Sequence, residues 1–172
     1  MIPEDGLTEG FEIILRNQWQ RIHGVLFRLT GDSAEAEDLA LEVFWRLYKR
    51  NNGSHDFNPE RWIYRVAVNL GLNALRARRR RQRYEQEAGH LALETHQSED
   101  PAVTVEQDQE RQRAQVALGM IKPRSAQMLI LRHSGMSYAE IAVAVGVSPA
   151  SVGALLRRAE AEFEQAYFKA AG

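Results

Sequence analysis

The stretch PERWIYRVAVNLGLNALRARRRRQR, residues 59–83, carries the main evidence for the fold. Pro59 and Glu60 suit the first turn of a helix, and Asn58 is a possible N-cap. At about 100° per residue, one side of this helix is apolar, which predicts that it faces a core. The apolar stripe comprises Trp62, Ile63, Val66, Ala67, Leu70 and Ala74.

A second side of the same helix is basic and polar. It carries Arg61, Arg65, Asn69, Asn73 and Arg76. Residues 57–83 contain eight arginines against one glutamate. A helix that buries one side and presents Arg and Asn on another suits contacts with phosphates and base edges. A solvated basic surface is the alternative, although solvated surfaces usually mix charge signs.

The net charge of the 172-residue chain is −1, but acidic and basic residues are concentrated in different segments. Residues 1–56, 57–83, 84–110 and 111–172 carry −4, +7, −8 and +4, respectively. Two basic blocks are therefore separated by an acidic one. Strand-type alternation is absent, so we predict an all-α protein.

Composition excludes several classes of protein. The chain has no cysteine, hence no disulfide framework or cysteine-based metal site. No run of about 18 apolar residues and no signal-peptide pattern occur, which predicts a cytoplasmic protein without membrane insertion. We expect no metal, no cofactor and no enzymatic activity, because neither a phosphate loop nor metal-ligand spacing is present. The five histidines are scattered: His23, His55, His90, His96 and His133.

Two helices are predicted before the basic one, over 7–29 and 33–49. Thr30-Gly31-Asp32 ends the first helix, and Asp32 or Ser33 caps the second. The second helix has two apolar sides, of which one should pack on its neighbours. The other is either buried too or forms an acidic-rimmed docking surface. It comprises Leu41, Phe44, Trp45 and Tyr48.

The segment 84–110 is acidic, lacks Lys and Arg, and shows little apolar periodicity. It is predicted to be a linker whose ends extend the flanking helices. We therefore expect three parts: a helical domain at 1–83, the linker at 84–110, and a second helical domain at 111–172.

The second domain ends in a helix-turn-helix pattern. Ser137 and Glu140 predict a capping box, and Gly146 lies in a tight turn. Ser148 caps the next helix, with Pro149 at its first position. Caps, turn and apolar positions agree, which favours DNA binding over a plain helical hairpin.

Three stretches together resemble the sigma factors of bacterial RNA polymerase, specifically the extracytoplasmic function (ECF) class of the sigma-70 family. GDSAEAEDLALEVFWRLYK resembles the helix that docks on the β′ clamp helices. ERWIYRVAVNLGLNALRARRRR resembles the helix that melts and reads the −10 element. GMSYAEIAVAVGVSPASVGALLRRAEAEF resembles the helix-turn-helix that reads the −35 element. The resemblance implies a region 2-like bundle and a region 4-like domain on the two sides of the linker.

The resemblance also implies partners and residue roles. The partners would be core polymerase (β′ clamp helices and β flap), promoter DNA, and an anti-sigma factor that holds the protein inactive. Polymerase docking would fall to Asp38, Leu39, Glu42 and Phe44. Binding of the −10 element, with a flipped base, would fall to Asn51, Asn52, His55, Phe57, Arg61, Arg65, Asn69, Asn73, Arg76, Arg78, Arg79, Arg80 and Arg81. Binding of the −35 element would fall to Ser148, Ala150, Ser151, Arg157 and Arg158.

The recognition helix departs from the family pattern. Gly153, Ala154 and Leu155 stand where the family usually has basic or small polar residues, and Gly153 costs about 1 kcal/mol of helix propensity relative to Ala. This departure supports one alternative, an interaction protein that kept the fold without −35 reading. A second alternative also stays open: a stand-alone helix-turn-helix repressor or activator with an N-terminal sensing or dimerisation domain.

Overall fold

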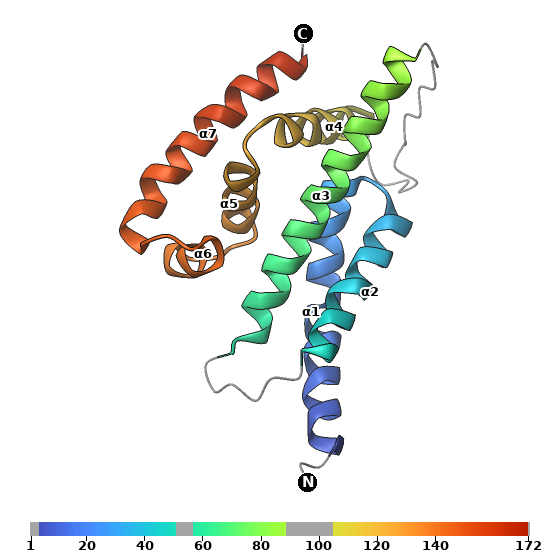
Figure 1. The fold of residues 1–172 in the computed structure, drawn as a ribbon, viewed down its shortest axis with the longest axis vertical. Coiled ribbons are helices and arrows are strands. Elements are labelled where there is room, and N and C mark those ends of the chain that lie inside the picture. Colours follow the sequence, from blue (N-terminus) through green and yellow to red (C-terminus); the bar gives the residue numbers. More distant parts are fainter. Residues whose placement is uncertain (1–3, 51–56, 89–104, 172) are drawn as a thin grey trace.

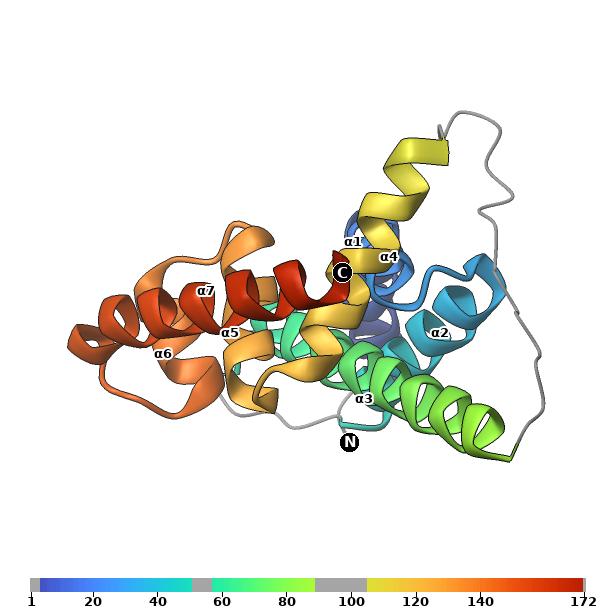
Figure 2. The same cartoon turned by 90° about the horizontal axis from the view of Figure 1, so that it is seen from above.

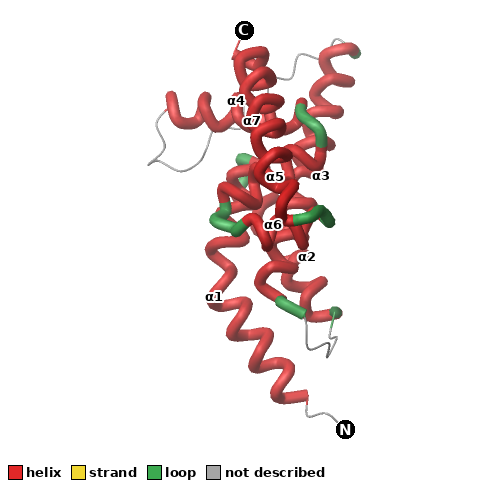
Figure 3. Tube along the Cα trace, turned by 90° about the vertical axis from the view of Figure 1, so that its left-hand side faces the viewer, coloured by secondary structure: helices red, strands yellow, loops and turns green. Residues whose placement is uncertain are grey.

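A computed structural model describes residues 4–50, 57–88 and 105–171, which form seven α-helices. Their order along the chain is shown in Figure 1. Figure 3 shows helices and short loops throughout the described residues, in agreement with the all-α prediction. The helices are α1 (Glu4–Thr30), α2 (Ser33–Lys49), α3 (Pro59–Glu87), α4 (Val105–Met120), α5 (Pro123–His133), α6 (Tyr138–Val145) and α7 (Pro149–Ala171).

The first three helices form a bundle whose ends follow the predicted signals. Gly31 has φ 70° and ends α1, a conformation that glycine adopts without steric cost. The Asp32 carboxylate accepts a hydrogen bond from the Glu35 amide at 2.8 Å, and so caps α2. The Asn58 side chain does the same for α3, through the Arg61 amide at 3.0 Å.

The core of this bundle lies where α3 crosses the first two helices. Its fully buried members include Ile22, Leu26, Leu29, Ala36, Ala40, Val43, Ile63, Ala67, Val68 and Leu72. Gly71 lets α3 approach α1 closely, because a Cβ there would lie 2.6 Å from the Leu29 Cδ1 atom. Of the predicted stripe, Ile63 and Ala67 are fully buried, whereas Val66 and Leu70 are half-buried and pack against the core.

The last four helices contain the predicted helix-turn-helix. Ser137 and Glu140 form a complete capping box at the start of α6. Gly146, with φ 69°, ends α6 in the left-handed conformation. Within the described ranges no single helix is long and apolar enough to cross a membrane. The pair Tyr138–Val145 and Pro149–Ala170 meets those criteria only when the two helices are taken together across an 86° bend.

The two groups of helices pack against each other along α3, which contacts α4, α5 and α6. Figure 2 shows α5, α6 and α7 on one side of α3, and α1 and α2 on the other. The Gln115 amide of α4 donates to the Arg28 carbonyl of α1 at 2.9 Å. Helix α3 contacts protein on two sides, so its buried residues extend beyond the predicted stripe to Val68, Leu72 and Leu75.

Candidate nucleic-acid interface and docking surface

The polar side of α3 lies partly under the helix-turn-helix domain. The Arg61 guanidinium, through Nε, forms an ion pair with the Glu140 carboxylate of α6 at 3.1 Å. The Asn69 side-chain oxygen accepts a hydrogen bond from the Gln127 amide of α5 at 2.8 Å. Arg65 is half-buried and Asn73 is exposed. Residues predicted to contact DNA therefore serve as contacts between the two helical groups in this structure.

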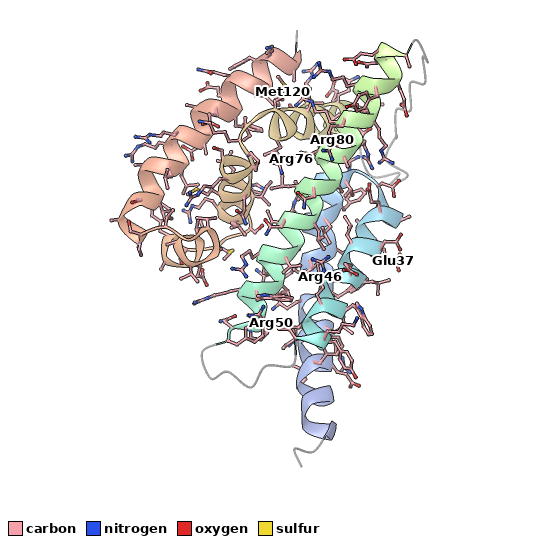
Figure 4. The ribbon with its side chains drawn as sticks, in the orientation of Figure 1. Glu37, Arg46, Arg50, Arg76, Arg80 and Met120 are labelled. Atoms are coloured by element: carbon pink, nitrogen blue, oxygen red, sulfur yellow. The ribbon has the colours of Figure 1, made fainter. Side chains whose placement is uncertain are left out.

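Arg76 lies on the same side of α3. Figure 4 shows its side chain in the region between α3 and α5. Its guanidinium is partly buried, and its NH2 nitrogen has no hydrogen-bond partner among the described residues. Burial lowers the pKa of this guanidinium, yet arginine stays charged at neutral pH. We call the packing of α4–α7 against α1–α3 the closed arrangement. In it, the charged Arg76 guanidinium is partly buried with one donor unsatisfied, which is unfavourable.

The arginines that follow Arg76 have different surroundings. Arg78 is half-buried and forms an ion pair with the Glu35 carboxylate, and it also donates to the Thr30 carbonyl. It therefore joins α3 to the α1–α2 corner, whereas the sequence interpretation made it a phosphate ligand. Arg79 lies near the Val116 carbonyl of α4, at 3.5 Å. Arg80 and Arg81 are exposed and remain available to a polyanion.

The predicted base pocket is only partly described. Asn51, Asn52 and His55 lie outside the described residues. Phe57, which follows them, contacts Trp62 edge-on with ring centroids 6.1 Å apart. The Arg50 guanidinium lies 5.0 Å from the Phe57 ring centroid and 5.2 Å from that of Trp62. Arg50, which directly precedes the loop, was not among the residues assigned from the sequence.

Three of the four residues on the second apolar side of α2 are exposed, so this side is not fully buried. Leu41 is 54% exposed, Trp45 50% and Tyr48 53%. The rings of Trp45 and Tyr48 stack with centroids 5.9 Å apart. Asp38 is exposed and Glu42 half-buried, and Leu39 is half-buried beside the core. We call the surface formed by Leu41, Trp45 and Tyr48 the α2 surface.

Phe44 does not belong to the α2 surface. It is 2% exposed, and its ring stacks on Trp19 of α1 with centroids 5.8 Å apart. The sequence interpretation placed Phe44 on the same side as Leu41 and Tyr48, because it lies one turn from each of them. In the structure the packing of α2 on α1 buries Phe44 in the core.

Helix α7, the second helix of the helix-turn-helix, presents few polar side chains at its start. Ser148 and Ser151 are exposed and hydrogen-bonded to each other at 2.7 Å, and Ala150 is exposed. Arg157 and Arg158 are exposed further along the helix. A Cβ at Gly153 would lie 3.4 Å from the Tyr138 ring, which is ordinary contact.

Among the residues that the structure describes, no group of three His, Cys, Asp or Glu side chains is placed to hold a metal ion. The features that could carry function are therefore the polar side of α3, the α2 surface and the start of α7.

Comparison with known proteins matches these features to named families. Residues 15–81 match the model of Sigma-70 region 2, and residues 111–163 match that of Sigma-70, region 4. The sequence is similar to the ECF RNA polymerase sigma factor SigE of Mycolicibacterium smegmatis, with 29% identity over 148 residues that cover 84% of this chain and 56% of that protein. It is 32% identical over 160 residues to the ECF sigma factor SigG of Mycobacterium tuberculosis, covering 80% of this chain and 43% of that protein. The chain thus spans about half the length of these relatives.

Two further similarities cover most of both chains. The RNA polymerase sigma factor CarQ of Myxococcus xanthus is 27% identical over 168 residues, covering 94% of this chain and 89% of that protein. In fold, the chain is similar to the sigma factor RpoE of Bartonella quintana, solved in complex with the anti-sigma factor NepR. That match has a TM-score of 0.57 at 19% identity, and it covers 92% of this chain and 96% of the other. This chain belongs to the sigma-70 family, in its extracytoplasmic function class.

Proposed function

We propose that this protein is a non-catalytic transcription initiation factor that directs core RNA polymerase to promoters. In this proposal the α2 surface, with Asp38 and Glu42 on its border, docks on the β′ clamp helices. The polar side of α3 reads and melts the −10 element, and α7 contacts the −35 element beside the β flap. Residues 1–83 and 111–172 act as separate domains on the two sides of the 84–110 linker.

The observation that carries this proposal is the presence of two unlike surfaces on one small helical bundle, an exposed apolar one on α2 and a basic, polar one on α3 that the α4–α7 group partly covers. An exposed pair of stacked aromatic rings on α2 is typical of a protein-binding surface. A line of Arg and Asn along the adjacent helix α3 suits nucleic acid. A stand-alone helix-turn-helix regulator requires neither of them.

The closed arrangement suggests that this structure is the resting form. Arg61 and Asn69 are engaged by α6 and α5, and Arg76 is partly buried. DNA that used these side chains would have to displace the helix-turn-helix domain. We propose that binding to core polymerase separates the two domains, and that an anti-sigma partner acts by opposing this separation.

Co-elution with a bacterial core RNA polymerase tests the docking part. Asp38→Arg with Glu42→Arg should weaken polymerase binding at least tenfold, because the reversed charges border the α2 surface. Phe44→Ala should instead lower the free energy of unfolding, by about 3–5 kcal/mol for a buried phenylalanine. Glu164→Arg reverses an exposed charge on α7 and is the matched control. Undiminished polymerase binding by the folded Asp38/Glu42 double variant would refute the docking assignment.

A further inference from the structure

A cavity of about 440 Å³ lies between the two groups of helices, away from the three surfaces described above. Apolar side chains from four helices line it: Val25 and Leu29 of α1, Leu118 of α4, Leu129 and Ile130 of α5, and Phe163 of α7. Its volume falls in the range of about 300–1,000 Å³ that is common for small-molecule sites.

The charged lining of this cavity is mainly basic. Arg28, Arg111, Arg132 and His133 line it, against one carboxylate, that of Glu160. Two of these arginines already have partners within the protein. Arg132 donates to the Met136 carbonyl at 3.2 Å, and Arg111 forms an ion pair with Asp108.

Arg111 lines the cavity and keeps one donor without an acceptor, although its NH2 group pairs with Asp108. Its guanidinium lies 4.9 Å from the centroid of the Phe27 ring. Its Nε atom is buried and has no hydrogen-bond acceptor within the described part of the chain. A buried donor without an acceptor is unfavourable, and an anionic oxygen brought into the cavity relieves this cost.

We propose that this cavity binds a small amphipathic anion, with an apolar body against the leucine, valine and phenylalanine side chains and one anionic head near Arg111. Apolar side chains beside an Arg111 donor without an acceptor favour an anion with an apolar body.

Such a ligand would stabilise the closed arrangement, because the walls of the cavity come from both α1 and the α4–α7 group. A ligand that binds only the closed form shifts the opening equilibrium by about 1 + [L]/Kd, which is about a hundredfold at a hundred times its Kd. This regulatory consequence rests on the proposed function, since closure engages Arg61 and Asn69. The binding itself does not depend on that function.

Calorimetric titration of the full chain with decanoate tests the site. We expect saturable 1:1 binding, and at least tenfold weaker binding of the uncharged 1-decanol and of acetate. Ala114→Leu fills the cavity from α4 and should abolish binding. Arg111→Met removes the charge and should weaken binding about tenfold, whereas Arg113→Met, at an exposed position of the same helix, should have no effect.

The possible results separate the site from its coupling. Absence of saturable binding, or equal binding by the Ala114→Leu variant with its helical circular dichroism intact, overturns the site. Equal affinity for 1-decanol overturns the anionic preference. The second measurement is binding of a single-stranded −10 oligonucleotide, which decanoate should weaken in the parent chain and leave unchanged in Ala114→Leu. If decanoate binds but does not weaken oligonucleotide binding, the ligand does not stabilise the closed arrangement. The proposed role in transcription is tested separately, by run-off transcription.

Discussion

Separation of the two domains should become easier when their polar contacts are removed without touching α3. The perturbation is Glu140→Gln combined with Gln127→Ala. A glutamine at position 140 can still close the capping box of α6, so the helix start is kept while the ion pair with Arg61 is lost. Gln127→Ala removes the hydrogen bond to Asn69.

The magnitude follows from the exposure of these contacts. The Arg61 side chain is 50% exposed, so its ion pair contributes about 0.2–1 kcal/mol. A neutral side-chain hydrogen bond contributes about 0.5–1.5 kcal/mol. Together they amount to about 0.7–2.5 kcal/mol, and the ratio of open to closed molecules should rise about 3- to 70-fold.

Single-molecule energy transfer can measure this ratio, because the chain has no native cysteine. Labels at Gln20→Cys on α1 and Gln165→Cys on α7 would report the separation, since both positions are exposed. Binding of a single-stranded −10 oligonucleotide should strengthen in parallel. The matched control is Glu42→Gln, which removes an exposed ion pair with Arg46 inside α2. An unchanged distance distribution, or weaker oligonucleotide binding, would refute the reasoning.

Two other substitutions test the same account. Gly153→Ala should raise the free energy of unfolding by about 0.5–1 kcal/mol, because alanine has the higher helix propensity and the added Cβ meets only ordinary contact. Gly71→Ala should lower the free energy of unfolding, because the added Cβ would clash with Leu29 of α1. Chemical denaturation measures both changes. Asn69→Ala with Asn73→Ala should relax sequence preference at the −10 element, because base-edge contacts discriminate by about 1–3 kcal/mol each. Alanines at Arg157–Arg158 should instead weaken promoter binding uniformly across −35 sequences and flatten its salt dependence. A promoter library transcribed at two salt concentrations distinguishes the last two outcomes.

The helices were predictable from the sequence because their signals are local. Asp32, Asn58 and the Ser137–Glu140 pair act on amides within three residues, and Gly31 and Gly146 end helices through their own backbone. Such signals do not depend on the rest of the fold.

The errors came from residues whose role depends on tertiary packing. Phe44 lies on the same helical side as Tyr48, but the packing of α2 on α1, including its contact with Trp19, buries it in the core. Arg78 belongs to a uniform run of arginines, and only the nearby Glu35 and Thr30 give it a structural role. The closed arrangement was also unpredictable, because Gln127 and Glu140 lie far along the chain from their partners on α3.

The most direct test of the central claim is run-off transcription by core RNA polymerase on a promoter library, with and without this protein. The account predicts that the protein adds transcripts from a subset of templates that share a −10 sequence, and that Asn69→Ala with Asn73→Ala broadens this subset. A set of transcripts that does not change when the protein is added would contradict the account.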